Sequence, residues 1–312
     1  MESTTWSEVE ARIVDDDRGK WDRKVPAPQL EIGDGGKLVA TNGGPAPDAL
    51  TLSDLATSQL CERLNIPATY YRRLPAEMKA TVANFDLKRL EERTFLLRGK
   101  GTHVRAFLSG EYVAYDNRQI AETVETLVKS DTIRIKAFVL EETNCFLKIV
   151  SEDLLEPASG LKAGIMIGNS EVGMGSVSVE PFVFRKACTN DLVVSADKAF
   201  RHAHIHFTPH ELTRRMAEAI GDGFVVASHV LDTFLKTKDE PIPDPLAVIR
   251  KIADDRKLSQ KLRDEVVARY IAEPESNRFG VINAFTGAAQ TLAPLARIDM
   301  ERFAGNLLTA SL

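Results

Sequence analysis

The fold is decided by residues 163–207, AGIMIGNSEVGMGSVSVEPFVFRKACTNDLVVSADKAFRHAHIHF. Two apolar runs, GIMIG and SVSVEPFVF, flank the segment NSEVGMG, whose Asn, Ser and Gly residues favour turn geometry. CTNDL predicts a second turn before another strand, and Pro181 within the long run indicates an edge strand or a bulge. The stretch therefore predicts consecutive strands of one sheet.

The residues before this stretch continue the sheet. TFLLRG and HVRAFLSG predict a hairpin around residues 99–101, and a helix is expected from Arg118 to Lys129. IRIKAFVL and NCFLKIV predict a further hairpin. Alternation divides its first strand into two faces, with Ile133, Ile135, Ala137 and Val139 on one and Arg134, Lys136 and Phe138 on the other. We expect the first face to be buried, and the basic and aromatic face either to meet water or to form a binding platform.

Helical signals flank the sheet on both sides. Leucines recur at helical spacing after Ser53, and Thr208-Pro209-His210-Glu211 predicts a capped helix start. We predict an α+β fold, with a central antiparallel sheet of about six to nine strands in residues 94–207, covered by helices from both flanks. The expected organisation is an irregular, Pro- and Gly-rich N-terminal arm (1–50), an α+β core domain (51–236) and a helical C-terminal region (237–312).

The composition is that of a globular protein able to bury a core: 312 residues, of which 44% are hydrophobic and 27% charged. Its cysteines, Cys61, Cys145 and Cys188, are few and far apart, which indicates a reducing cytoplasm. The N-terminus is polar and acidic, unlike a signal peptide, and no apolar run approaches the ~20 residues of a membrane helix. We expect a cytoplasmic protein without membrane association.

The net charge of −5 argues against a uniformly basic nucleic-acid-binding surface, although local patches decide binding.

Catalytic motifs are missing from the sequence. RGKGT and GDGGKL lack the spacing of a phosphate-binding loop, and no GxGxxG after a strand, GxSxG or HExxH occurs. Cys188 is interpreted as a thiol beside a turn, not as a nucleophile. No residue set argues for an enzyme, and no cofactor is expected apart from the metal considered next.

The histidines are the strongest candidates for metal ligands. If RHAHIHF is a strand, His202, His204 and His206 share one face and could chelate zinc or iron. The alternative is a polar face that contacts phosphate or a neighbouring subunit. The acidic triplet Asp15-Asp16-Asp17 is interpreted as a solvated charge run.

Several elements occur in an order that resembles a known family: LNIPATYYRRL, VRAFLSGEYVAYDN, IGNSEVGMGSVSVEPFVFRKACTND and RHAHI. The chain resembles the phage- and plasmid-borne domain of unknown function 932 across residues 50–235. The most specific residues are Asn169, Ser170 and Glu171, then Cys188, Thr189 and Asn190, then Arg201 and His202. Asp191 stands where the family tends to place a glycine. Because the family has no established activity, the resemblance implies a link to mobile elements and no reaction.

Single-stranded DNA binding or annealing in recombination is our first hypothesis, because a curved sheet backed by a helix and a basic, aromatic face would suit it. The predicted phosphate contacts are Arg72, Arg73, Arg98, Lys100, Arg105, Arg134, Lys136, Arg185 and Lys186, and the predicted stacking surfaces are Tyr70, Tyr71 and Phe138. Packing of the tyrosines, with the arginines solvated, would give the same composition.

Two alternative functions remain open. One is a non-enzymatic antagonist of host defence that acts through protein–protein contacts, and the other is a metal-dependent enzyme that uses the histidines. Exposed strand edges predict a homo-oligomer.

Overall fold

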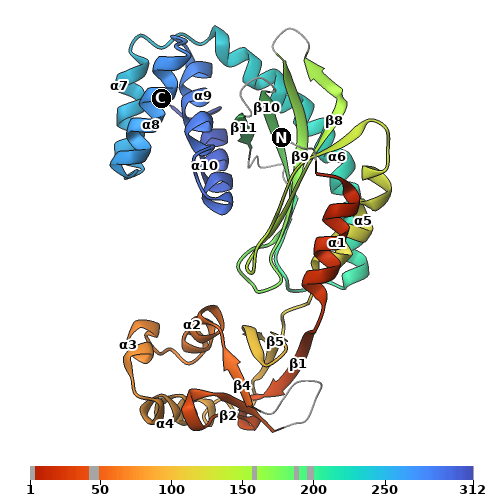
Figure 1. Ribbon diagram of the computed structural model, residues 1–312, viewed down its shortest axis with the longest axis vertical. Helices are drawn as coiled ribbons and strands as arrows, with labels where there is room; N and C mark the ends of the chain where they lie inside the picture. Colours follow the sequence, from red (N-terminus) through yellow and green to blue (C-terminus); the bar gives the residue numbers. More distant parts are fainter. Residues whose placement is uncertain (1–3, 42–48, 157–159, 186–189, 195–199, 312) are drawn as a thin grey trace.

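The protein has two lobes that follow one another along its long axis (Figure 1). The computed structural model describes residues 4–41, 49–156, 160–185, 190–194 and 200–311. The small lobe is formed by the described residues between 20 and 109, and the large lobe by residues 6–17 together with the described residues from 117 onward. The mixture of sheets and helices, with a helical C-terminal region, confirms the predicted α+β class.

The small lobe is built on a mixed sheet in the order β1-β5-β6-β4-β3-β2. Its strands are β1 (Lys20–Pro26), β2 (Leu30–Ile32), β3 (Leu38–Ala40), β4 (Ala49–Leu52), β5 (Thr94–Lys100) and β6 (His103–Ser109). Its helices are α2 (Asp54–Arg63), α3 (Ala68–Arg73) and α4 (Ala76–Leu87), and two short turns of 3-10 helix are η1 (Ala27–Gln29) and η2 (Asp34–Gly36). Fully buried Leu50, Leu60 and Phe107 belong to one core that joins the helices to the sheet.

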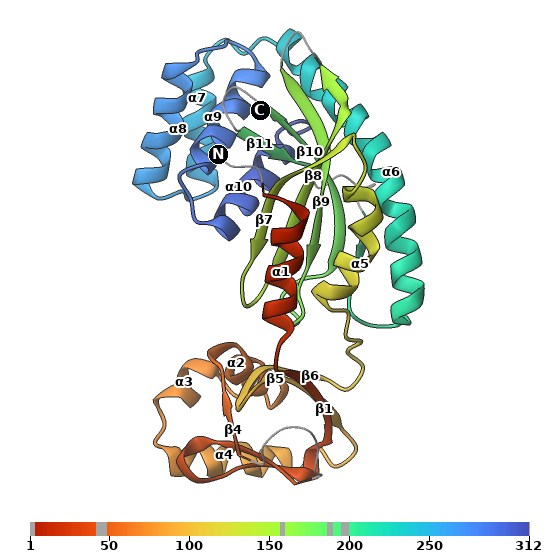
Figure 2. The same ribbon diagram turned by 45° about the vertical axis from the view of Figure 1, so that its right-hand side comes forward.

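The large lobe is built on an antiparallel sheet in the order β11-β10-β9-β8-β7, with β12 also paired to β10. Its strands are β7 (Ile133–Leu140), β8 (Cys145–Glu156), β9 (Leu161–Asn169), β10 (Val177–Arg185), β11 (Asn190–Val193) and β12 (Phe200–His202). Its helices are α1 (Trp6–Asp17), α5 (Asn117–Val128), α6 (Pro209–Lys236), α7 (Pro245–Asp255), α8 (Gln260–Ala272), α9 (Arg278–Ala289) and α10 (Pro294–Asn306), and a 3-10 turn, η3 (Thr237–Asp239), follows α6. Figure 2 shows α1, α5 and α6 on one side of the sheet and α7 to α10 on the other.

Two sequence-based expectations about the sheet and its flanks are wrong. The strands in residues 94–109 belong to the small-lobe sheet, because β5 pairs with β1, where Val25 lies opposite Phe95. Residues 1–50, expected to be an irregular arm, contain α1 and β1 to β3, and β4, where Leu50 pairs with Leu38, runs across the expected boundary. The Pro and Gly residues in this region punctuate short strands, and strands of three or four residues are too short for alternation to reveal them.

A bulge changes the faces of β7. The pairing register with β8 shifts between Ile135 and Ala137, so that Ile135 lies opposite Ile149 and Ala137 opposite Lys148. Phe138 consequently joins the apolar core beneath α1 and α5 and not the face of Lys136. The basic and aromatic platform predicted from Arg134, Lys136 and Phe138 is therefore not formed. A single inserted residue reverses strict alternation for every residue that follows it.

The other face of the large sheet is joined to α10 by buried charges. Lys148 Nζ donates to Asp191 Oδ2 at 2.7 Å and to Glu301 Oε2 at 2.6 Å. Burial would lower the pKa of Lys148, but the charges of Asp191 and Glu301 raise it. Burial raises the pKa of Glu301 to about 7, and the neighbouring charge of Asp191 adds to the rise. The charge of Lys148 opposes this shift but does not cancel it. This cluster ties the last helix to the sheet.

Replacing Lys148 by Met should destabilise the protein strongly, because Asp191 and Glu301 would stay buried without their cation. We expect the free energy of unfolding to fall by about 3 kcal/mol, the usual consequence of removing one member of a buried ion pair. Urea unfolding followed by circular dichroism measures it. Lys129→Met, at the exposed end of α5, is the matched control and should leave the midpoint unchanged. Equal midpoints for both variants would contradict this account of the cluster.

Candidate functional site

The turn between β9 and β10 is where the two lobes meet. Ser170, at its start, is fully buried, and its hydroxyl donates to Thr143 O at 2.7 Å and accepts from Met174 N at 2.9 Å. On the small-lobe side, Gln59 Nε2 donates to Val172 O at 2.8 Å. Residues 170–173 are thus anchored to the β7–β8 turn at one end and to α2 at the other.

Glu171, in this turn, holds elements of both lobes with one carboxylate. Its Oε2 accepts from Lys20 Nζ at 2.7 Å and from both terminal nitrogens of Arg105 at 3.1 Å. Its Oε1 accepts from the backbone N–H of Asn117, at the start of α5, at 3.0 Å. Burial would raise the pKa of Glu171, but the charge of Lys20 and these hydrogen bonds lower it to about 2. The side chain therefore stays ionised throughout the physiological range.

Arg98 extends the same network. Its guanidinium donates to Asp22 Oδ1 at 2.8 Å, to Asp116 Oδ1 at 2.5 Å and to Glu171 O at 2.8 Å. Burial would lower the pKa of Arg98, but the charges of Asp116 and Asp22 outweigh it and raise the pKa. Arg98 and Arg105, predicted as phosphate contacts, thus use their charge inside the lobe junction.

Aromatic packing closes the junction beside these ions. Tyr112 OH donates to Ser170 O at 2.9 Å, and its ring lies with Leu108 and Val172 in a small buried cluster. The His204 ring stacks on Tyr112 with centroids 4.8 Å apart and planes 5° from parallel. Burial lowers the pKa of His204 to about 4, so the imidazole is neutral at pH 7.

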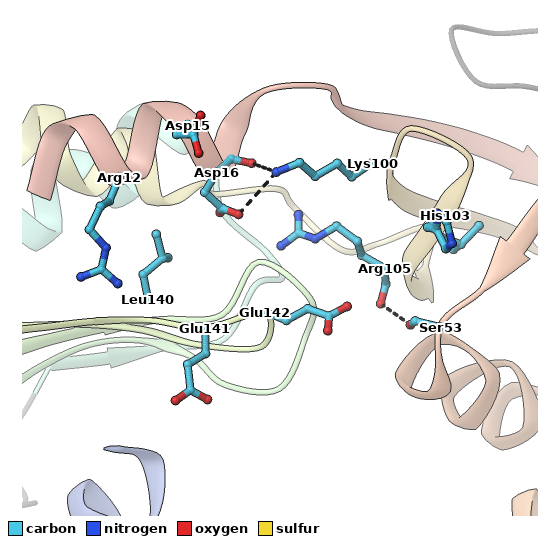
Figure 3. A pocket seen from close by; sticks show the side chains of 11 residues that line it. Arg12, Asp15, Asp16, Ser53, Lys100, His103, Arg105, Leu140, Glu141 and Glu142 are labelled. Atoms are coloured by element: carbon cyan, nitrogen blue, oxygen red, sulfur yellow. Dashed lines mark hydrogen bonds and ion pairs between the residues drawn. The ribbon is translucent and has the colours of Figure 1, made fainter. Parts of the chain in front are cut away.

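An open cleft of about 660 Å³ lies at the junction (Figure 3). One wall comes from α1, the opposite wall from β5, β6 and the start of α2, and the floor from the β7–β8 turn. The polar lining residues are Arg12, Asp15, Asp16, Ser53, Lys100, His103, Arg105, Glu141 and Glu142. Of the phosphate contacts predicted from the sequence, the cleft therefore contains Lys100 and Arg105. It adds Arg12, which stands in no basic or aromatic run, and His103, which lies between the two predicted contacts in RGKGTHVR but was not itself predicted.

The acidic residues of α1 are largely neutralised within this cleft. Asp16 Oδ2 accepts from Lys20 Nζ at 2.6 Å, and Asp16 O accepts from Lys100 Nζ at 2.8 Å. Asp15 pairs with Arg18 at 3.2 Å. The interpretation of the acidic triplet as a solvated charge run is thus wrong for Asp16, which is built into the junction. Arg12 stacks over the Phe138 ring at 4.8 Å and has no carboxylate within 4 Å among the described residues.

The remaining predicted nucleic-acid contacts are scattered. In α3, Tyr70 is exposed whereas Tyr71 is buried, and Arg72 donates to Asp54 O and Ser58 Oγ. Arg73 is exposed on the same helix.

The other predicted contacts lie on the large sheet. Exposed Arg134 donates to Ile133 O at 2.9 Å. Lys136 lies over the Phe184 ring at 4.7 Å, and Arg185 pairs with Glu273 at 2.7 Å. Lys186 lies outside the described residues. No single surface unites this set.

The histidines do not form the predicted chelate. The strand ends at His202, and His206 has a φ of +59°, so the alternation expected of a longer strand is broken. His202 Nδ1 contacts Ala203 O at 2.7 Å, His204 is buried against Tyr112, and His206 is exposed. Within the described ranges, no group of three or more His, Cys, Asp or Glu residues could hold a metal ion.

The family-like motifs meet around the junction in part. Asn169 Nδ2 donates to Tyr115 O at 3.0 Å and to Asn117 Oδ1 at 2.9 Å, which fixes the start of α5 beside Glu171. Asn169 and Arg201 also line one small polar pocket on the α10 side of the β7–β8 turn. Cys188 and Thr189 lie outside the described residues, and Asn190 begins β11. Asp191, the departure from the family pattern, is the residue that pairs with Lys148.

No family model, no curated protein and no solved structure matches this chain. Across the residues that the structure describes, no helix combines the length and the apolar character needed to cross a membrane.

Replacing Glu171 by Gln tests the junction network. We expect a loss of about 3 kcal/mol in unfolding free energy at pH 7, because Lys20 and Arg105 lose their shared anion. The pKa of Glu171 is lower in the folded protein than in the unfolded chain. Its contribution is therefore complete above the unfolded value of about 4.5 and disappears as the pH falls toward about 2.

Denaturant unfolding at a series of pH values should therefore show the wild type converging on Glu171→Gln as the solution becomes acidic. Glu122→Gln, which removes an exposed carboxylate paired with Arg118 on α5, is the control and should follow the wild type. A constant gap between wild type and Glu171→Gln from pH 7 to pH 2 would show that the carboxylate charge is not what matters.

Proposed function

We propose that this protein binds single-stranded nucleic acid in the cleft between its lobes. The observation that carries the proposal is that basic side chains from separate elements converge on one open cleft. Arg12 comes from α1, Lys100 and His103 come from β5 and β6, and Arg105, whose charge is already paired with Glu171, lies beside them. Two of them, Lys100 and Arg105, were predicted as phosphate contacts from the sequence alone. Clusters of this kind supply the salt-dependent part of nucleic-acid affinity.

The size and chemistry of the cleft favour an unpaired strand. A volume of about 660 Å³ matches pockets for small organic groups, so it would hold a short stretch of single strand and not a duplex. The Arg12 guanidinium lies over the Phe138 ring, with Cζ 4.8 Å from its centroid, and a guanidinium plane offers a surface on which a base can stack. Lys100 supplies positive charge at the opposite wall, and the His103 side chain lies on the same wall (Figure 3).

The acidic residues define where the strand would run. Asp15 and Asp16 already pair with neighbouring cations. Glu141 and Glu142 are exposed at the β7–β8 turn, and Glu141 points away from Lys100 and Arg105 in Figure 3. The backbone of the strand would follow the Lys100 wall and stay clear of this turn. Annealing in recombination is the use of such binding that we propose.

Fluorescence anisotropy of a labelled single-stranded oligonucleotide, titrated across salt beside a duplex, tests the proposal. We expect a steep salt dependence and a preference for the single strand. Arg12→Gln and Lys100→Gln should each weaken binding and reduce the slope of log K against log salt by about 0.7, the value for one lost phosphate contact on a single strand.

Arg214→Gln, which removes an exposed arginine paired with Glu218 on α6, is the charge-matched control and should bind like the wild type. Equal losses for Arg214→Gln and the two cleft variants would place binding outside the cleft. No binding of either nucleic acid at low salt would overturn the proposal.

A further inference from the structure

A second, smaller pocket lies on the α10 side of the β7–β8 turn, opposite the interlobe cleft. Its volume is about 260 Å³, and it is bounded by β8, the β9–β10 turn, Arg201 and α10. The polar side chains that matter here are Arg201, Arg302, Asn144, Ser176 and Asp299. None of these belongs to the binding surface proposed above.

Beneath this pocket a buried carboxylate positions two guanidinium groups. Glu180 is fully buried on β10, and it accepts from Arg302 in a two-pronged arrangement, Nη2 to Oε1 at 2.6 Å and Nε to Oε2 at 3.0 Å. Arg201 Nη2 reaches the same Oε2 at 3.3 Å. Glu180 thus fixes the plane of Arg302 and draws Arg201 toward it, as expected for arginine–carboxylate geometry.

The arginines of the pocket have more hydrogen-bond donors than the described acceptors use. Two arginines share one buried carboxylate, and the other acidic side chain at the rim, Asp299, is 79% exposed and 3.7 Å from Arg302 Nη1. Among the described residues, Arg201 Nε and Nη1 donate to no protein acceptor. The hydroxyl of Ser176 lines the same space. The pocket therefore offers guanidinium donors without a described protein acceptor in a small volume.

We propose that this pocket binds a phosphate-type oxyanion. A tetrahedral dianion would accept from Arg201, from Arg302 Nη1 and from Ser176, in charge-assisted hydrogen bonds with the two guanidinium groups. Arg201 is one of the residues that carry the family resemblance, and the proposed site gives it a role.

Two sources could supply this anion: free phosphate, or the terminal phosphate of a nucleic-acid strand. Both pockets flank the same turn, residues 140–145, so a strand held in the interlobe cleft would have its end nearby. Binding of inorganic phosphate does not depend on the proposed function. Recognition of a strand end rests on it.

The test compares wild type with Arg201→Gln and Ser176→Asp, two substitutions at positions that are not buried. Arg118→Gln on α5 is the matched control for loss of one exposed, paired arginine. Inorganic phosphate should raise the thermal unfolding midpoint of wild type and Arg118→Gln, because an ion that binds only the folded state stabilises it. The rise should disappear in Arg201→Gln and Ser176→Asp, whose folding is checked by circular dichroism.

Oligonucleotides with a 5′-phosphate, a 3′-phosphate or no terminal phosphate then distinguish the sources. A strand-end site predicts that one phosphorylated strand binds wild type about tenfold more tightly than the unphosphorylated strand, as expected for a charge-assisted hydrogen bond, and that Arg201→Gln removes the difference. Phosphate stabilisation without an end preference identifies free phosphate as the source. Identical responses to phosphate in wild type, Arg201→Gln and Ser176→Asp would overturn the site, whether or not single strands bind elsewhere.

Discussion

The buried carboxylate of Glu171 is the constraint on which the rest of the structure depends. A carboxylate removed from water is tolerated only when charges and hydrogen bonds replace its hydration, and here the replacements come from β1, β6 and the first turn of α5. Elements far apart in the sequence must therefore converge on one turn between β9 and β10. The interlobe cleft is a consequence of this convergence, because Lys20 and Arg105 bring their neighbours Asp16, Lys100 and His103 to its walls.

The same principle joins the C-terminal helices to the large sheet. Lys148 with Glu301, and Glu180 with Arg302, are ion pairs between the sheet and α10 in which at least one side chain is fully buried. Apolar residues such as Phe182 and Ile298 fill the space between the charges. The apolar contacts between α10 and the sheet stabilise the fold. The ion pairs fix the position of α10, because a shifted helix would leave charges buried without their counterions. The pocket between Arg201 and Arg302 owes its shape to this fixed position.

Sequence patterns predicted the parts of this fold that rest on local periodicity, and missed those that rest on long-range pairing. The β7–β8 hairpin, the β9–β10 turn and the capped start of α6 follow from alternation, turn residues and the Thr208 cap. The division into two sheets did not follow, because the partner of β5 is the irregular-looking β1. Phe138 was misplaced by a bulge that leaves no sequence signal.

The candidate site was predicted in part. Lys100 and Arg105 were identified by their charge, but Glu171 was singled out only as part of a family-like motif, and its central role was not predicted. An acidic residue within the apolar run SVSVEPF was the one overlooked sign of Glu180.

Hydrogen–deuterium exchange of the wild-type protein, with and without a saturating single-stranded oligonucleotide, tests the central claim most directly. The account predicts slower exchange in residues 12–16 and 100–105, which form the walls of the cleft, and unchanged exchange in the outer helices α7 and α8. Protection confined to α3, or to the exposed face of α6, would contradict it, because the strand would then bind away from the junction that Glu171 organises.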